Sequence, residues 1–485
     1  MRLIISPCNV ISTLEINIMT SLSRSLSAIA IMDYHWVHRG TLGVLFQVFL
    51  PLLASSSITA SHLPQTAAPI IDGKPFMVIW NGPLNRCAHY AVPLDMSAFQ
   101  AVTTPAMVPN QFLSLFYRNH MGLCPWTDYK TEIEYNGGFP QMGDLKASLA
   151  KSKAEVTEYI PNFSSGLGVI DWEDWRPIYD RNWGNKRIYQ KLSVEYAQQQ
   201  DPSLTEEEAE VLARQQFEHA ARGFMEDTVR LAESERPEYL WGFYLFPNCY
   251  NYDTDKPGYT GKCGETVEQH NNQLLWLWEA STALFPSAYL PLHLRGDPAA
   301  ALFVRNVVQE AMRVSALPQR PYTAPVFLYS RPLFRDQNEV YYTEIDLVRS
   351  VGEAAALGGS GTVMWGASAD YNTKASCENL SDYLLSTLNP YIANVTAATQ
   401  VCSDFLCQGN GRCIRRNYNT DTYLHLNPKH FRIQRSVSGY TVTGTPTMQD
   451  FADMYSHFTC QCYAGRSCSV TMPTQPPLTP LVIHI

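Results

Sequence analysis

The decapeptide GVIDWEDWRP, residues 168–177, joins a short apolar run to three carboxylates, two tryptophans and an arginine. An apolar run of this kind predicts a buried strand. Acidic groups at the end of a buried strand are costly unless they are solvated, partnered or used. Because strand side chains alternate between faces, we expect Asp171 and Glu173 to project to the same side and Trp172 to face away.

The spacing of Asp171 and Glu173 indicates a particular chemistry. Two carboxyls this close cannot comfortably both be ionised, so the pKa of one should rise, and a carboxylic acid still protonated near working pH can protonate a glycosidic oxygen. The usual two-carboxylate glycosidase separates its carboxyls by about 5 to 10 Å across the bond, which neighbours on one strand cannot do. An N-acetyl group of the substrate is then the natural nucleophile. The alternative is structural: an acidic strand end that caps the next helix, with Asp174 and Arg176 paired at the surface.

Comparable apolar or aromatic runs recur along the chain and alternate with helical stretches. The runs lie at 76–80, 113–117, 168–171, 240–246, 287–291, 325–330 and 361–365. The clearest helix begins at Ser203, where Ser203 and Glu206 form a predicted capping box, and stops at Pro237. Two further helices are expected at 301–314 and 344–358. Strands that alternate with helices predict a parallel sheet, and seven of them favour a closed β/α barrel.

Aromatic or polar residues stand at the ends of several runs. They are Trp80, Asn81, Tyr117, Asp171, Tyr329 and Trp365. The carboxyl ends of barrel strands form the active-site face. Strands favour aromatic residues in any case, so one such end means little, but together they lean towards a cleft lined for carbohydrate.

Composition bounds the class of protein. The chain has 485 residues and a formal net charge of −9, which argues against nonspecific nucleic-acid binding. The same charge means that a polyanionic substrate would need a local basic cluster. The 12 cysteines contain no CxxC pair, and we expect neither a metal site nor another cofactor.

Several features indicate the secretory pathway. An apolar stretch at 42–54, within an N-terminal extension over 1–60, has the pattern of a signal peptide, with an uncleaved anchor as the alternative. Glycosylation sequons occur at Asn162, Asn379 and Asn394. Disulfides are the default state of the cysteines in a secreted chain.

The composition of the sequence changes after Asn394. A barrel over 70–395 is expected to be followed by a cysteine-rich module over 396–468 and a tail over 469–485. The module has six cysteines whose spacing resembles a modified EGF-like module and leaves many pairings open. The final residues, PPLTPLVIHI, form too short an apolar tail for a lipid-anchor signal.

Four motifs together resemble the animal hyaluronidases, glycoside hydrolase family 56, which includes the bee and wasp venom enzymes. The motifs are GLGVIDWEDWRP, WGFYLFPNCYNY, STALFPSAYLP and GGSGTVMWG, and the segments NPYIANVT and YLHLNP are most similar to the vertebrate branch with sperm-surface and membrane-anchored members. The resemblance covers about residues 70–468. It implies a distorted TIM-like (β/α) barrel of about seven parallel strands, followed by a small disulfide-rich EGF-like module.

The resemblance also implies an activity and its residues. The activity is endo-acting, retaining hydrolysis of the β-1,4 bond between N-acetylglucosamine and glucuronic acid in hyaluronan. Glu173 is similar to the family's general acid and base, Asp171 to its proton-sharing partner, and Tyr289 to a tyrosine that positions the attacking N-acetyl group. The implied substrate-binding residues are Tyr117, Tyr244, Trp365 and Arg176, with Asn81 and Tyr329 as weaker candidates.

The resemblance carries over a set of disulfides and a location. The implied pairs are Cys87–Cys377, Cys249–Cys263, Cys402–Cys413, Cys407–Cys460 and Cys462–Cys468. Cys124 has no partner in this set, and we expect it to be a free buried thiol. The family resemblance is compatible with a secreted, cell-surface, acrosomal or lysosomal protein.

Two alternative functions stay open. One is a hydrolase that prefers chondroitin, against which Tyr289 speaks because it favours hyaluronan. The other is an adhesion protein that binds hyaluronan with weak or no hydrolysis. Val307 and the cysteine-rich tail motivate the second alternative, because many relatives carry an arginine at position 307 that is a suspected substrate contact, and because such tails often mediate contacts. We expect Arg176 to supply cationic charge for the polyanion beside the acid. Arg86, Arg118 and Arg331 also lie just past predicted strand ends and are further candidates for a basic cleft.

Overall fold

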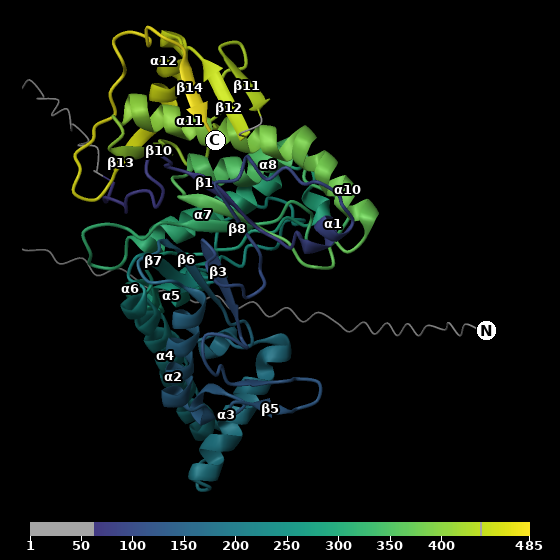
Figure 1. Ribbon diagram of the computed structural model, residues 1–485. Helices are drawn as coiled ribbons and strands as arrows, with labels where there is room; N and C mark the ends of the chain where they lie inside the picture. Colours follow the sequence, from purple (N-terminus) through teal and green to yellow (C-terminus); the bar gives the residue numbers. More distant parts are fainter. Residues whose placement is uncertain (1–62, 437–438) are drawn as a thin grey trace, which may run out of the picture. The chain divides into compact units, whose positions relative to one another are not determined.

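The computed structural model describes residues 63–436 and 439–485, and the predicted signal segment at 42–54 lies outside them. Seven short strands run parallel in two groups (Figure 1). One group has the order β3–β6–β7 and the other β2–β1–β9–β8. The strands are β1 (Met77–Asn81), β2 (Ala101–Thr103), β3 (Leu113–Tyr117), β6 (Gly166–Asp171), β7 (Tyr239–Phe243), β8 (Phe327–Ser330) and β9 (Gly361–Trp365).

Single bridges connect the two groups into a barrel. Tyr244 pairs with Phe285, and Leu284 pairs with Val326, so the segment between β7 and β8 closes one gap. Strands β2 and β3 are in contact at the other gap. The predicted closed β/α barrel is confirmed, with irregular closure on both sides.

The run at 287–291 was predicted to be a strand, and this prediction is wrong. Only one bridge, Ser287 to Tyr329, forms there. Pro286 and Pro291 flank the segment, and proline has no N–H to donate to a ladder. The segment therefore follows the barrel wall without pairing along its length.

Side chains alternate between the barrel interior and the helices outside. Met77 and Ile79 of β1 pack in the interior cluster, whereas Val78 and Trp80 pack in an outer cluster. Strand β6 does the same, with Leu167 and Val169 inside. Asp171 continues this inward parity, and the fold therefore directs it towards the barrel's interior side.

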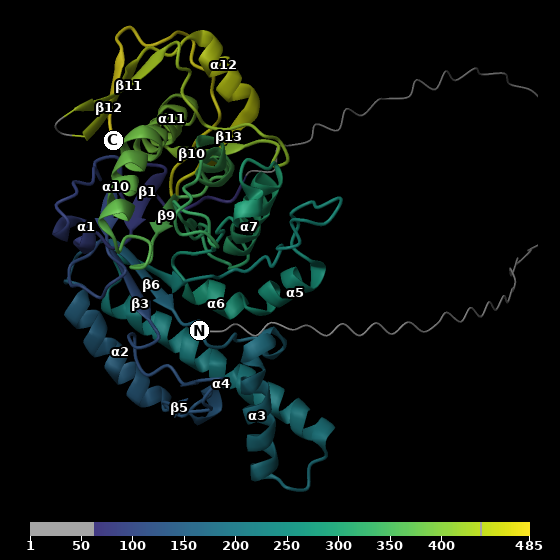
Figure 2. The ribbon, with the colours of Figure 1, turned by 90° about the vertical axis from the view of Figure 1, so that its right-hand side faces the viewer.

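Helices cover the outside of the barrel (Figure 2). The longer ones are α2 (Leu145–Tyr159), α3 (Arg187–Gln200), α4 (Glu206–Glu235), α7 (Ala299–Ser315), α10 (Lys374–Tyr383) and α11 (Asn389–Leu406). The shorter ones are α1 (Asn85–His89), α5 (Glu265–Gln273), α6 (Leu275–Ala280), α8 (Glu344–Leu347) and α9 (Glu353–Ala356). The predicted helix at 344–358 is thus two α-helical pieces joined by a π turn.

The start of α4 corrects the predicted capping box. Thr205 is the N-cap, and its side chain and that of Glu208 make the reciprocal bonds. Ser203 instead donates to Asp201 at 2.5 Å. The same pattern of a hydroxyl residue and a glutamate three positions later occurs twice here, and the second copy adjoins the helix.

The cysteine-rich part contains two small antiparallel sheets and one helix. Strand β10 (Gly411–Arg415) pairs with β13 (Phe458–Cys462), and β12 (Gly439–Gly444) lies between β11 (Phe431–Ser436) and β14 (Leu481–His484). Helix α12 (Met448–His457) packs beside them. The tail predicted over 469–485 therefore ends as a strand of this sheet. Helix α11 runs through the boundary expected at 395/396 and contacts β1, β10 and β12, so this division of the chain stays a prediction.

Five disulfides join the same pairs that the family resemblance implies. They are Cys87–Cys377, Cys249–Cys263, Cys402–Cys413, Cys407–Cys460 and Cys462–Cys468. Cys124 is free and buried. The Cys87–Cys377 bond spans 290 residues of sequence and ties α1 to α10, which holds the first strand's loop to the last helix of the barrel.

The three sequons differ in exposure. Asn162 and Asn379 are exposed, whereas Asn394 is half-buried and its Oδ1 accepts a hydrogen bond from the backbone of Leu426 at 2.8 Å. Glycosylation at all three stays a prediction. No helix within residues 63–436 and 439–485 is long and apolar enough to cross a membrane.

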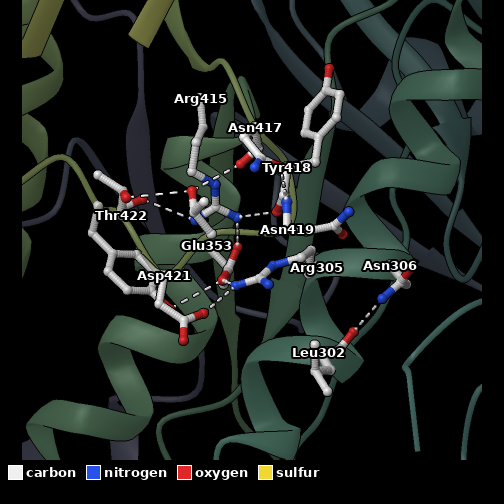
Figure 3. A network of polar contacts seen from close by, with 12 residues as sticks. Leu302, Arg305, Asn306, Glu353, Arg415, Asn417, Tyr418, Asn419, Asp421 and Thr422 are labelled. Carbon is white, nitrogen blue, oxygen red and sulfur yellow. Dashed lines mark hydrogen bonds and ion pairs between the residues drawn. The ribbon is translucent and has the colours of Figure 1, made fainter. Parts of the chain in front are cut away.

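A buried charge network joins the barrel helices to the cysteine-rich part (Figure 3). Glu353 at the start of α9 accepts from Arg305 of α7 at 2.5 Å and from Arg415 of β10 at 2.6 Å. All three side chains are at most 2% exposed. Arg305 also bonds Asp421 at 2.6 Å. One carboxylate therefore neutralises two buried guanidinium groups from different parts of the fold.

Replacing Glu353 should destabilise the protein severely. Glu353→Gln keeps the shape but removes the carboxylate that pairs with Arg415 and leaves Arg305 with Asp421 alone, and breaking a buried pair costs about 3–5 kcal/mol. Urea unfolding with disulfides intact measures the free energy of unfolding. The control is Glu378→Gln, whose exposed carboxylate faces Lys374 at 3.4 Å and should change stability little. Equal effects of the two variants would contradict a central role for the network.

Candidate active site

The carboxylate pair lies where β6 ends. Asp171 is the last residue of β6 and stands in register with Tyr117, the last residue of β3. Trp172 is 4% exposed and packs edge-on against Phe243 at 5.7 Å in the outer cluster. The predicted alternation is confirmed for Trp172, and Glu173 begins the turn just beyond the strand.

Burial and mutual repulsion divide the roles of the two carboxyls. Burial, and after it the negative charge of Glu173, raises the pKa of Asp171 well above its usual range. A hydrogen bond between the two side chains acts in the same direction, whereas Arg176 opposes it. The Glu173 side chain is 52% exposed. The pair thus has a buried member that holds its proton and an exposed member that can reach a substrate.

Arg176 does not pair with Asp174 as the structural alternative proposed. Its guanidinium donates to the carbonyl oxygen of Glu173 at 2.8 Å, and its other terminal nitrogen lies 3.7 Å from the Glu173 carboxylate. Asp174 pairs instead with Arg118 at 2.5 Å. Asn182 accepts from the backbone N–H of Arg176 at 2.8 Å, and this turn of the chain directs the arginine back over Glu173.

Four predicted aromatic residues form one connected group. Trp365 donates from its indole nitrogen to the Tyr117 hydroxyl at 3.3 Å and stacks on Tyr289, with ring centroids 6.2 Å apart. Tyr289 and Tyr244 share a hydrogen bond, and Tyr244 also bonds Ser287 at 3.2 Å. All four are partly exposed. Their positions beside Asp171 suit a surface that meets sugar rings.

Asn81 and Tyr329 lie deeper than a cleft lining requires. Asn81 is 0% exposed and donates to Thr103 at 2.9 Å, which makes it a link between β1 and β2. Tyr329 is 1% exposed and packs edge-on against Tyr244 at 4.9 Å. Both strand ends face the interior cluster, so these residues support the floor of the site without contributing surface to it.

Val307 and Arg331 are also displaced from their expected roles. Val307 is 4% exposed within the core around α7, so the missing arginine there removes no cation from the cleft of this chain. Arg331 is 8% exposed and pairs with Asp370 at 2.6 Å, with its guanidinium 5.4 Å from the Trp365 ring. Arg331 therefore lies beside the Trp365 ring, and its charge is paired with Asp370.

A cleft of about 1110 Å³ opens at the carboxylate pair. Tyr117, Asp171 and Glu173 are part of its lining. A second hollow of about 720 Å³ shares Tyr117 with this cleft and includes Trp365. The two hollows therefore meet at the aromatic group, as a groove for a chain substrate would require.

Sequence reasoning missed the far wall of the cleft. Trp126 of β4 (Trp126–Thr127) stacks on Tyr135 of β5 (Glu134–Tyr135), with centroids 4.1 Å apart, and the Arg118 guanidinium lies 3.6 Å from the Trp126 ring. Two groups this close must cover opposite faces of the indole. Tyr135 is 41% exposed and offers its outer face to the cleft. The alternation in WTDYKTEIEYNGG around a turn was the available signal.

The cleft is not strongly basic, contrary to expectation. Its cations are Arg118, Lys151 and Lys186, and its carboxylates are Asp128, Asp171, Glu173 and Asp174. Arg118 and Lys151 are already paired, with Asp174 and Glu155 respectively. Arg86 is exposed at α1 and is not part of this lining. A polyanion must therefore be bound by individual cations of the cleft and not by an overall positive charge.

Comparisons with known proteins agree with this geometry. The hyaluronidase family model matches residues 65–473. Hyaluronidase-5 of Mus musculus is 44% identical over 405 residues, covering 83% of this chain and 77% of the relative. Hyaluronidase PH-20 of Homo sapiens is 42% identical over 429 residues, covering 88% and 84%.

A solved structure extends the agreement to the fold. Bee venom hyaluronidase in complex with a hyaluronic acid tetramer matches with a TM-score of 0.58 and 30% sequence identity, over 66% of this chain and 98% of that chain. The match confirms the predicted barrel fold. The chain belongs to the hyaluronidase family, glycoside hydrolase family 56.

Proposed function

We propose that this chain hydrolyses the β-1,4 bond between N-acetylglucosamine and glucuronic acid in hyaluronan, with Glu173 as general acid and base. Membership of the hyaluronidase family and the likeness to a venom enzyme solved with a hyaluronic acid tetramer support the substrate. The observation that carries the mechanism is the placement of Asp171 and Glu173 two residues apart at the end of β6, where the charge of Glu173 raises the pKa of Asp171. Carboxyls in contact cannot stand on opposite sides of a scissile bond about 5 to 10 Å apart.

The nucleophile is therefore assigned to the substrate. The carbonyl oxygen of the N-acetyl group attacks the anomeric carbon while Glu173 protonates the departing glycosidic oxygen. Glu173 then takes a proton from water, which opens the cyclic intermediate from the face that the leaving group vacated. Two inversions retain the configuration of the sugar.

Asp171 supports Glu173 by keeping its own proton. When Glu173 gives up its proton, a negative charge develops against a neighbour whose pKa is raised by burial. A neutral Asp171 can donate a hydrogen bond to that charge, whereas an ionised one would repel it. Arg176, 3.7 Å from the Glu173 carboxylate, adds cationic charge beside it.

Tyr289 is the proposed donor to the N-acetyl carbonyl. Burial and the neighbouring tyrosines raise its pKa well above the usual range, so its hydroxyl stays protonated at any working pH. The stack on Trp365 and the hydrogen bond with Tyr244 fix its orientation. A donor held in place before the reaction stabilises the transition state without reorganisation.

We also propose a location outside the cytosol. Disulfides persist in oxidising compartments, and residues 63–436 and 439–485 contain five. Exposed sequons at Asn162 and Asn379 are compatible with passage through the secretory pathway. Secretion, a cell-surface position, the acrosome and the lysosome all satisfy these observations.

Glu173→Gln should strongly reduce polymer cleavage. Loss of a general acid and base reduces turnover by about 10²- to 10⁴-fold, while the isosteric amide leaves the cleft intact for binding. Hyaluronan size on gels and reducing-end release measure turnover, with chondroitin as the comparison polymer. Glu195→Gln, an exposed position on α3, is the control and should be fully active. Near-normal turnover by Glu173→Gln would refute the mechanism, and binding without cleavage by the wild type would favour an adhesion protein.

Tyr289→Phe should lower kcat by about 10²-fold and leave KM nearly unchanged. The variant keeps the ring that stacks on Trp365 and removes only the hydroxyl, whose hydrogen bond matters most in the transition state. Steady-state kinetics on hyaluronan separate the two constants. A rise in KM with an unchanged kcat would instead assign Tyr289 to ground-state binding.

Asp171→Asn should stabilise the protein increasingly as the pH rises. Because folding raises the pKa of Asp171, the native state keeps a proton that the unfolded chain releases near its ordinary pKa of about 3.9. The contribution of this proton to the free energy of unfolding is fully present below that pH. It is lost as the pH rises through the raised native pKa. The amide does not titrate, so the Tm of the variant should exceed that of the wild type by more at pH 8 than at pH 4. Parallel Tm curves for wild type and Asp171→Asn would contradict the raised pKa.

A further inference from the structure

Lys186 stands at the end of a short 3-10 turn, Gly184–Lys186, that borders the catalytic cleft. Its ammonium group donates to the carbonyl oxygen of Glu173 and, at 3.0 Å, to that of Asp174. A lysine ammonium has three N–H donors, and two of them are used by these backbone groups. One donor is therefore left beside the proposed acid.

Lys186 differs in its partners from the other cations in and beside the cleft. Arg118 is paired with the carboxylate of Asp174, and Lys151 with that of Glu155. Arg176 faces the carboxylate of Glu173 at 3.7 Å. Within residues 63–436 and 439–485, no carboxylate forms an ion pair with Lys186. Burial, and after it the positive charge of Arg176, lowers the pKa of Lys186 to about 8, as expected for a desolvated ammonium whose contacts are backbone carbonyls.

We propose that Lys186 recognises the carboxylate of a glucuronate unit bound in the cleft next to the scissile bond. This inference rests on the proposed function, because it takes a chain of alternating N-acetylglucosamine and glucuronic acid as the ligand. Such a chain presents one carboxylate in every disaccharide, so an N-acetylglucosamine placed at Glu173 has a carboxylate on each neighbouring sugar. An ammonium with a free donor in a partly desolvated cleft is the matching group.

The two backbone bonds of Lys186 orient this donor. They anchor the lysine to the same turn that carries Glu173, so the ammonium and the acid keep a fixed separation. A carboxylate held by Lys186 would thereby place the adjacent glycosidic oxygen relative to Glu173. Lys186 is accordingly a substrate-positioning residue as well as a source of charge.

The test crosses two variants of the protein with two forms of the polymer. Wild type and Lys186→Met are assayed on hyaluronan and on hyaluronan whose glucuronate carboxyls have been reduced to alcohols. A charge-assisted hydrogen bond contributes about 1.5–3 kcal/mol, so Lys186→Met should raise KM on hyaluronan about 10-fold or more. On the reduced polymer, wild type and Lys186→Met should have the same KM. Lys186→Arg should keep most of the affinity.

The control variant is Lys191→Met, which removes an equal charge from an exposed lysine of α3 outside the cleft lining. It should change neither constant on either polymer, which excludes a long-range effect of net charge. If Lys186→Met lowers kcat equally on both polymers, Lys186 only braces the catalytic turn and the proposal is overturned. An unchanged KM on hyaluronan overturns it as well.

Binding separates this inference from the proposed function. Calorimetry with a hyaluronan hexasaccharide and the inactive Glu173→Gln variant measures Kd without turnover, with and without Lys186→Met. About 10-fold weaker binding in the double variant, lost when the hexasaccharide carboxyls are reduced, supports Lys186 even if the wild type fails to cleave the polymer. Equal affinity, or no binding to either, overturns the inference.

Discussion

The site depends on two adjacent carboxyls that cannot comfortably both be ionised. Asp171 ends a strand with inward parity, and burial there makes its ionisation unfavourable, so Glu173 is the member left to exchange protons with a substrate. This division needs a rigid frame, because a small displacement of either carboxyl would bring water between them. Register with Tyr117 on β3 fixes Asp171, and the turn after it is fixed by cations acting on backbone oxygens. The barrel therefore determines which of the two carboxyls keeps its proton, as well as where the side chains lie.

Cations near an acid have two opposed effects, and the fold separates them. Arg176 and Lys186 both donate to the carbonyl oxygen of Glu173, which holds the turn in place. Neither makes a close bond to the Glu173 carboxylate, since the Arg176 contact is 3.7 Å. A close pair would favour the ionised form and deprive the site of its proton donor. Cationic charge is thus available to the substrate or to the transition state.

Much of this could be predicted from the sequence, because the signals were local. Strand alternation placed Asp171 and Trp172 on opposite faces, and the alternation of strands and helices gave the barrel. Errors arose where tertiary context decides. Prolines on both sides of 287–291 prevented a ladder. Asn81 was expected in the cleft, but it continues the inward parity of β1 and donates to Thr103 of the neighbouring strand β2. The wall of Trp126 and Tyr135 was missed because its relation to Glu173 depends on how a hairpin folds back over the cleft.

An acidic protein that acts on a polyanion must bind it by something other than net charge. The cleft supplies ring faces at Tyr117, Trp365 and Tyr135, and three of its four carboxylates are accounted for by the proton-sharing pair and by the Asp174–Arg118 bond. Sugar rings present apolar faces that flat aromatic groups can cover, so the polymer's backbone is held where its charges are not. A carboxylate then needs a partner only where register matters, which is beside the bond to be cut. A single cation fixed to the catalytic turn meets that need, and a uniformly basic groove would hold the polymer equally well in registers that place no bond at Glu173.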